Sequence, residues 1–212
     1  MVNVFLLGDS INLDYGQFVP AFLKSGIHVY GKPGAEEAYE NLDIPIGGNG
    51  GDSRMVLEYL QTAEGPVLDC DYFIFNCGLH DLKHNAKTGL LQVPLEEYEQ
   101  NLQAIVELMQ NRGVKVVFIN TTPTDQTRYS AIKSFYRLTE DVPAYNQAAQ
   151  AVMTRNQVPV IDLYGFTQAL GLSGDDLFRD HTHFTPAVIK LHSAFIAGFI
   201  NGFAETKKEE TL

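Results

Sequence analysis

The sequence has little cysteine, few basic residues and no long apolar run, and each shortage argues against a class of protein. Two cysteines in 212 residues are too few for a disulfide framework, so Cys70 and Cys77 are expected to be reduced thiols. Fifteen basic against 26 acidic residues give a formal net charge of −11, which argues against nucleic acid as a partner. We find no stretch long enough to span a bilayer and no basic segment before the first apolar run. We therefore expect a cytoplasmic protein without membrane insertion.

The remaining composition is that of one globular domain. Hydrophobic residues make up 45% of the chain, and 212 residues are enough to bury one core. We place this domain at 1–203. The charged tail at 204–212 has almost no apolar residues and is expected to be frayed.

Five short apolar runs alternate with segments of helical periodicity. The strands are expected at 2–7, 27–30, 71–76, 114–120 and 158–163, and the helices at 15–25, 53–60, 95–112, 143–157, 166–170 and 186–203. The segment at 31–51 is rich in glycine and is expected to be a loop, which either presents backbone N–H groups to a ligand or is merely flexible. This alternation predicts an α/β fold with three layers, α/β/α, around a flavodoxin-like, five-stranded parallel sheet of order 2-1-3-4-5.

A serine follows the first predicted strand, in Gly8-Asp9-Ser10. Open α/β folds bind ligands at the carboxyl ends of their strands, and a helix beginning near Ser10 would offer N–H groups to developing negative charge. The serine is therefore a candidate nucleophile. Serine is also a preferred helix N-cap, so this stretch alone leaves both interpretations open.

A candidate base and carboxylate for this serine lie near the other end of the chain, in Asp180-His181-Thr182-His183. Residues three apart lie on one side of a helical turn, so Asp180 is expected to reach the ring of His183. A carboxylate at one ring nitrogen fixes the tautomer, and the other nitrogen can accept the proton of a serine. Together the two clusters predict a triad of Ser10, His183 and Asp180.

Four blocks now resemble the SGNH (GDSL-type) hydrolase family. They are Gly8-Asp9-Ser10, Gly50-Gly51-Asp52-Ser53, Gly78-Leu79-His80-Asp81 and Asp180-His181-Thr182-His183, in this order over nearly the whole chain. The resemblance implies a serine esterase that cleaves carboxylic esters through an acyl-enzyme, with Ser10 as nucleophile, His183 as base and Asp180 as its orienting partner. It implies a small-molecule ester as substrate, with acetyl on a carbohydrate as the leading candidate, and no cofactor. The oligomeric state stays open.

The resemblance also implies an oxyanion hole. Its donors would be the N–H groups of Ser10 and Gly51 and, in the family, an asparagine of a Gly-x-Asn-Asp block. This chain has His80 in place of that asparagine. Loss of one oxyanion donor can lower turnover by roughly 10²- to 10³-fold, but an imidazole can still donate from one nitrogen. We expect His80 to act as the third donor.

Two other functions fit parts of the sequence. A metal-dependent hydrolase would use imidazoles and carboxylates that can bind zinc or manganese, but it leaves Gly8-Asp9-Ser10 unexplained. Its ligands would come from His80, Asp81, Asp180, His181 and His183. The second alternative is a ligand-binding member of the same fold, weakened in catalysis by the exchange at His80. The connection at 121–141 is unusually long and is either a lid over a pocket or a surface excursion with one helical turn. It carries Arg128, Tyr129, Phe135, Tyr136 and Arg137.

Overall fold

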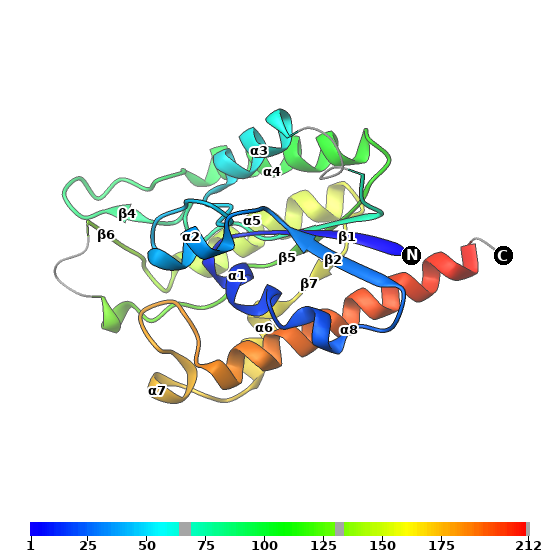
Figure 1. The fold of residues 1–212 in the computed structure, drawn as a ribbon. Coiled ribbons are helices and arrows are strands. Elements are labelled where there is room, and N and C mark those ends of the chain that lie inside the picture. Colours follow the sequence, from blue (N-terminus) through cyan, green and yellow to red (C-terminus); the bar gives the residue numbers. More distant parts are fainter. Residues whose placement is uncertain (64–68, 130–133, 211–212) are drawn as a thin grey trace.

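The computed structural model describes residues 1–63, 69–129 and 134–210, with side chains as far as residue 205 in the last helix. Five parallel strands form one sheet between two layers of helices (Figure 1). Its order is β2-β1-β3-β5-β7, which is 2-1-3-4-5 when the strands of this sheet are counted along the chain. The predicted α/β class and order are therefore confirmed. The strands are β1 (Val2–Leu7), β2 (Ile27–Gly31), β3 (Tyr72–Phe75), β5 (Lys115–Ile119) and β7 (Val160–Ile161).

The central strands β1, β3 and β5 are largely apolar on both faces because helices cover both sides of the sheet there, whereas the edge strand β2 is only partly buried. Phe5 and Leu7 of β1 pack in one core, and Val4 and Leu6 pack in the other. The first core is covered by α3 (Ser53–Thr62), α4 (Leu95–Gln110) and α5 (Asp141–Arg155). The second is covered by α1 (Ser10–Gly16), α6 (Leu163–Ala169) and α8 (Pro186–Glu210). Figure 1 shows α3 and α4 above the sheet and α1, α6 and α8 below it.

Two local predictions are wrong. The segment at 15–25 is not one helix, because α1 ends at Gly16 and a 3₁₀ turn, η1 (Val19–Phe22), follows. Pro20 lacks the N–H that an α-helix would need there, and its ring would clash with the preceding turn. The glycine-rich segment at 31–51 is not all loop, because it contains α2 (Ala35–Glu40). Alanine and glutamate favour this helix.

The last helix is longer than predicted. Helix α8 continues past 203 to Glu210, since alanine, glutamate and lysine favour helix. The predicted tail at 204–212 is thus helical as far as it is described, and 211–212 lie outside the described residues. By length and composition Pro186–Glu205 could cross a membrane, contrary to our expectation for the sequence, but 44% of its most apolar window is buried. Its residues Val188 and Ile196 belong to the second core, as in the core helix of a globular domain.

A small antiparallel ribbon lies away from the two termini, at the end of the molecule toward which the strands run (Figure 1). Its strands, β4 (His84–Asn85) and β6 (Phe135–Tyr136), have two residues each, too few for any alternation to predict them. The ribbon joins the connection at 121–141 to the segment that follows β3. That connection also holds the turn η3 (Gln126–Arg128), while its residues 130–133 lie outside the described part of the chain.

Candidate active site

Ser10 is the first residue of helix α1 and lies directly beyond the end of β1. The N-cap is Asp9, whose Oδ1 accepts the N–H of Ile11 at 2.9 Å. The cap interpretation therefore applies to Asp9 and leaves the hydroxyl of Ser10 available for another partner. Gly8 is required before this turn because a Cβ atom there would lie 1.8 Å from Oδ1 of Asn76.

The structure brings the three predicted triad side chains into one hydrogen-bonded chain. Ser10 Oγ lies 2.8 Å from Nε2 of His183, and Nδ1 of His183 lies 2.7 Å from Oδ2 of Asp180. Ser10 and His183 are each 3% exposed. Burial alone would raise the pKa of Asp180, but the hydrogen bond and charge of His183 and two backbone N–H groups hold it well below its usual value. Asp180 is therefore ionised beside the imidazole.

The loop that carries Asp180 and His183 is not the helical turn that the spacing suggested. Phe178 and Phe184 form an isolated antiparallel bridge, and their rings stack with centroids 5.1 Å apart. Within this loop Oδ1 of Asp180 accepts the N–H groups of Thr182 and His183, both at 2.8 Å. Aspartate favours such turns because its side chain bonds the backbone just ahead of it. These bonds from the backbone to the aspartate side chain, and not a helical turn, therefore bring Asp180 close to His183.

An ion pair fixes this loop against the helix that carries the serine. Nη2 of Arg179 lies 2.8 Å from Oδ2 of Asp14, a residue one turn after Ser10 in α1. Asp14 is 2% exposed, and burial raises its pKa while the charge of Arg179 opposes that rise. Arg179 also donates its backbone N–H to the carbonyl of His183 at 2.9 Å. Two segments about 170 residues apart in sequence are thus held in register.

Of the three predicted oxyanion donors, one is engaged in another hydrogen bond in this structure. Ser10 N–H stands at the start of α1, where a helix leaves its first N–H groups without an intrahelical acceptor. Gly51 N–H donates to Oδ1 of Asn49 at 3.0 Å in this structure, so its role as an oxyanion donor stays a prediction that requires this bond to open. An asparagine side chain commonly accepts from the backbone two residues on. Asn49 is fully buried, so water does not compete for this bond.

His80 is buried beside the triad, with 1% of its surface exposed. Its Nδ1 lies 3.0 Å from Nζ of Lys83, and its Nε2 has no hydrogen-bond partner among the described residues. Burial first, and then the charges of Lys83 and Arg137, lower the pKa of His80 well below its usual value. The ring is therefore neutral, and one of its nitrogens carries the single proton.

The ligand set of the metal alternative does not assemble. Asp81 turns away toward α3, where its Oδ1 accepts the N–H of Ser53 at 2.9 Å, and burial raises its pKa to about 7. His181 packs its ring against Tyr129, with centroids 4.4 Å apart, and its Nε2 lies 3.3 Å from Oδ1 of Asp43. Across the described ranges, no three histidine, cysteine, aspartate or glutamate side chains are placed to hold a metal ion.

Arg137 links the segments that carry His80 and His183 through hydrogen bonds. No motif around Arg137 in the sequence predicts this link. Only 2% of Arg137 is exposed, whereas the lid interpretation expects it on a segment that covers a pocket. Its Nε donates to the carbonyl of Leu79 at 2.5 Å, and its Nη1 donates to the hydroxyls of Tyr129 and Thr182 at 3.0 and 3.1 Å. One guanidinium therefore bridges the third and fourth blocks, which no pairing of sequence motifs could reveal.

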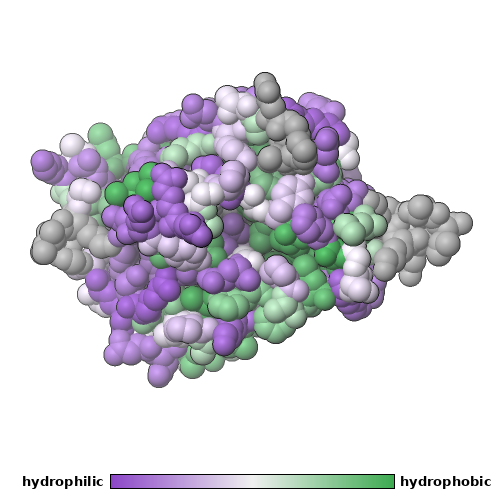
Figure 2. Space-filling view, viewed as in Figure 1, coloured by the Kyte–Doolittle hydropathy of each residue, from purple (hydrophilic) through white to green (hydrophobic). Residues whose placement is uncertain are grey.

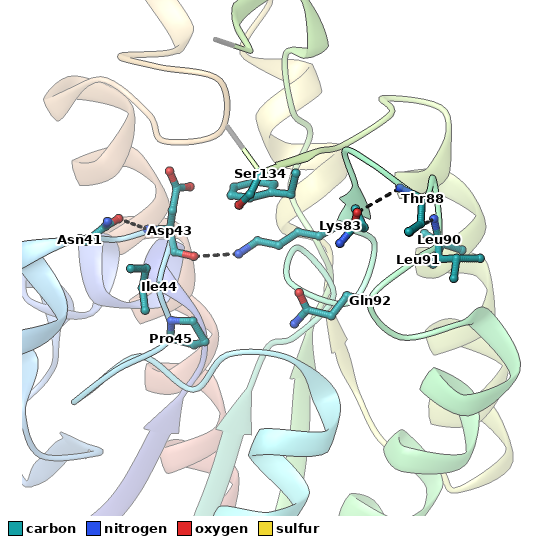
Figure 3. Close-up of a pocket in the computed structure, with 12 residues that line it drawn as sticks. Asn41, Asp43, Ile44, Pro45, Lys83, Thr88, Leu90, Leu91, Gln92 and Ser134 are labelled. Carbon is teal, nitrogen blue, oxygen red and sulfur yellow. Dashed lines mark hydrogen bonds between the residues drawn. The ribbon is translucent and has the colours of Figure 1, made fainter. Parts of the chain in front are cut away.

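A pocket of about 710 Å³ is lined by Lys83, the hydrogen-bond partner of His80, and by none of the three triad residues (Figure 3). Its lining mixes polar groups such as Asp43, Lys83 and Gln92 with apolar ones such as Leu90 and Phe135. In Figure 3 the side chain of Lys83 crosses the pocket to the backbone of Asp43. The face shown in Figure 2 is largely hydrophilic toward the β4–β6 end of the molecule, with apolar side chains gathered over the η1 and α8 side.

Comparisons with known proteins give a consistent result. The sequence model of the GDSL-like Lipase/Acylhydrolase family matches residues 6–190. Among proteins with curated functions, none matches the chain.

Three solved structures illustrate the similarity of the fold. A lipase/acylhydrolase from Enterococcus faecalis is 20% identical, with a TM-score of 0.68 over 95% of this chain and 96% of that one. The acetyl xylan esterase AlAXEase is 15% identical, with a TM-score of 0.66 over 94% and 100%. The psychrotrophic esterase EstA from Pseudoalteromonas sp. is 12% identical, with a TM-score of 0.63 over 97% and 100%.

Proposed function

Because the chain belongs to the GDSL-like lipase/acylhydrolase family, we propose that it is a serine esterase acting on carboxylic esters through an acyl-enzyme intermediate. The observation that carries the proposal is the hydrogen-bonded chain from Asp180 through His183 to Ser10, at 2.7 and 2.8 Å. It supplies an alcohol, a base in contact with its proton, and an ionised group that orients the base.

The proposed reaction has two halves. Ser10 Oγ attacks the ester carbonyl while His183 Nε2 takes its proton, and the resulting imidazolium is stabilised by Asp180 at Nδ1. His183 then gives that proton to the departing alcohol, and the acyl group remains on Ser10. In the second half His183 takes a proton from water, the hydroxide attacks the acyl carbonyl, and Ser10 recovers its proton as the acid leaves.

We assign the oxyanion to two donors, Ser10 N–H and His80 Nε2–H. Both belong to groups that follow the carboxyl ends of adjacent strands, β1 and β3. The unpartnered Nε2 of His80 is buried, and a buried donor without an acceptor is costly unless a ligand fills that position. Gly51 contributes only in states in which its bond to Asn49 has opened.

Two observations bear on which ester is the substrate. The pocket in Figure 3 is lined by the amides of Asn41 and Gln92, the hydroxyl of Thr88 and the apolar side chain of Leu90, a mixture suited to the polar alcohol part of an ester. One of the similar structures is named an acetyl xylan esterase. The pocket favours a polar alcohol such as a carbohydrate, and the likeness to that esterase favours acetyl as the acyl group. The cytoplasmic location remains a prediction.

The decisive experiment compares two buried serines that both stand at the start of a helix. Ser10→Ala should abolish labelling by a fluorophosphonate probe and hydrolysis of p-nitrophenyl acetate. Ser53→Ala, the matched control in α3, should retain both. Labelling of Ser10→Ala, or turnover near that of the wild type, would contradict the nucleophile assignment, and absence of labelling in the wild type would favour the ligand-binding alternative.

The oxyanion assignment and the substrate class need their own measurements. His80→Ala should lower kcat by roughly 10²- to 10³-fold and should slow, but not abolish, labelling of the folded protein. An unchanged kcat would remove His80 from the oxyanion hole. A panel of p-nitrophenyl esters of increasing acyl length should show the highest kcat/KM for acetyl, and a maximum at long chains would contradict the proposed substrate class.

A further inference from the structure

Lys83 is a buried cation beside the proposed oxyanion donor. It follows His80 by three residues in a turn in which its backbone N–H donates to the carbonyl of His80 at 3.3 Å. Only 5% of its surface is exposed. A buried lysine is uncommon and needs partners for its ammonium protons. The proposed reaction leaves this residue without a role.

The surroundings of Nζ account for the ammonium protons. Nζ lies 2.8 Å from the carbonyl oxygen of Asp43 (Figure 3). It also lies 3.0 Å from Nδ1 of His80 and 4.4 Å from the ring centroid of Phe135. A carbonyl oxygen can only accept, and the face of an aromatic ring attracts a cation. These contacts fit a charged ammonium group that donates.

A charged lysine determines which nitrogen of His80 carries the proton. An ammonium group has three donors and no acceptor, so Nδ1 of His80 must accept and must be unprotonated. The single proton of the neutral ring then lies on Nε2, the nitrogen without a partner in the described structure. Without this contact the two tautomers of an imidazole compete, and the Nδ1–H form would present no proton from Nε2.

We propose that Lys83 is a positioning residue that holds His80 in its Nε2–H tautomer, so that an imidazole can replace an amide as oxyanion donor. This proposal rests on the proposed function of the site. An asparagine at position 80 would need no such partner, because its NH₂ group always carries donors. A histidine at position 80 can therefore serve as this donor because the buried Lys83 fixes its tautomer.

The other charged groups that face His80 do not duplicate this contact. They are Arg137, Asp43 and His183. The guanidinium of Arg137 donates to Leu79 and to two hydroxyls, as described above. Among the hydrogen bonds of the described residues, the one from Lys83 is the bond that reaches the His80 ring.

A double-mutant cycle tests the proposal. Lys83→Met is made in the wild type and in a His80→Asn background, which restores an amide donor. In the wild type Lys83→Met should lower kcat for p-nitrophenyl acetate by about tenfold or more, with KM changed by less than about twofold. In the His80→Asn background the same substitution should change kcat by less than about twofold. Lys83→Arg, which keeps a donor-only cation, should recover part of the loss.

Three outcomes would overturn the proposal. An equal loss of kcat in both backgrounds would make Lys83 a structural residue, and an effect confined to KM would make it a substrate contact in the pocket of Figure 3. The third is a tautomer result from ¹⁵N NMR of labelled protein, with the His80 signals assigned by their absence from His80→Asn. In the wild type the proton of His80 is expected on Nε2. In Lys83→Met the signal of this tautomer should disappear or average with that of the Nδ1–H form. A proton on Nδ1 in the wild type would contradict the proposal. The NMR result does not depend on turnover, so it separates failure of this proposal from failure of the esterase assignment.

Discussion

Replacing Arg137 by methionine should destabilise the protein and disturb catalysis at the same time. Methionine approximates the aliphatic part of the side chain but removes every donor of the guanidinium. In the wild type those donors satisfy the carbonyl of Leu79 and the hydroxyls of Tyr129 and Thr182 at 2.5, 3.0 and 3.1 Å. All three acceptors lose their partner in the variant, and Leu79 and Thr182 are the neighbours in sequence of His80 and His183.

The size of the effect follows from burial. Each buried acceptor left unpaired costs about 1–3 kcal/mol, but the two hydroxyls can rotate toward other partners and the cost of burying a cation disappears. We therefore expect a net loss of about 3 kcal/mol in the free energy of unfolding. For a chain of this length such a loss corresponds to a fall in Tm of roughly 6–12 °C.

The assay is thermal and urea unfolding, together with kcat on p-nitrophenyl acetate well below the Tm of the variant. Arg128→Met is the matched control, because Arg128 lies in the same connection but forms its ion pairs with Asp125 and the exposed Asp175 at the surface. It should change Tm far less than Arg137→Met, since surface ion pairs contribute little. Equal effects of the two substitutions, or an unchanged Tm for Arg137→Met, would refute the bridging role.

Three further predictions concern the site and its pH dependence. Asp180→Asn should lower kcat by roughly 10³- to 10⁴-fold with the fold retained by circular dichroism, because an amide no longer holds the imidazole in the required tautomer; a loss under tenfold would contradict the triad. The carboxyl of Asp81 has its pKa raised from 3.8 to about 7, so folding favours its protonated form and that stability is lost as pH rises from about 4 to 7. Asp81→Asn should therefore gain stability relative to the wild type between pH 4 and pH 8, by up to about 4 kcal/mol in urea unfolding, and a pH-independent difference would refute this. Prolonged dialysis against EDTA should leave turnover unchanged, whereas a loss restored by zinc or manganese would revive the metal alternative.

The parts of the site that could be predicted are those whose position depends on residues close by in the sequence. Ser10 follows an apolar strand, and its place beyond a strand end in a parallel sheet is a consequence of chain order. The link between Asp180 and His183 spans three residues and is made within one loop, although by backbone bonds of the aspartate and not by a helical turn. The departure at His80 is equally visible, because one residue differs within an otherwise matching block.

The parts that could not be predicted depend on segments that meet only after folding. Gly51 is adjacent to the right elements, but its N–H is taken by Asn49, a choice made by loop conformation. Arg137 is indistinguishable in sequence from a surface arginine of a long connection, and its burial becomes visible only when the connection folds over the strand ends. The ribbon of β4 and β6 is too short to leave a periodic signal.

The sequence by itself determined the α/β class, the strand order and the candidate nucleophile, base and orienting acid, because these follow from hydrophobic periodicity and from short motifs. The tertiary structure alone decided which N–H groups remain available, which nitrogen of His80 faces Lys83, and how Arg137 and the Asp14–Arg179 pair hold distant loops together. The physical reason is that hydrogen bonds and desolvation act over a few ångströms in space, and separation along the chain carries no information about that distance.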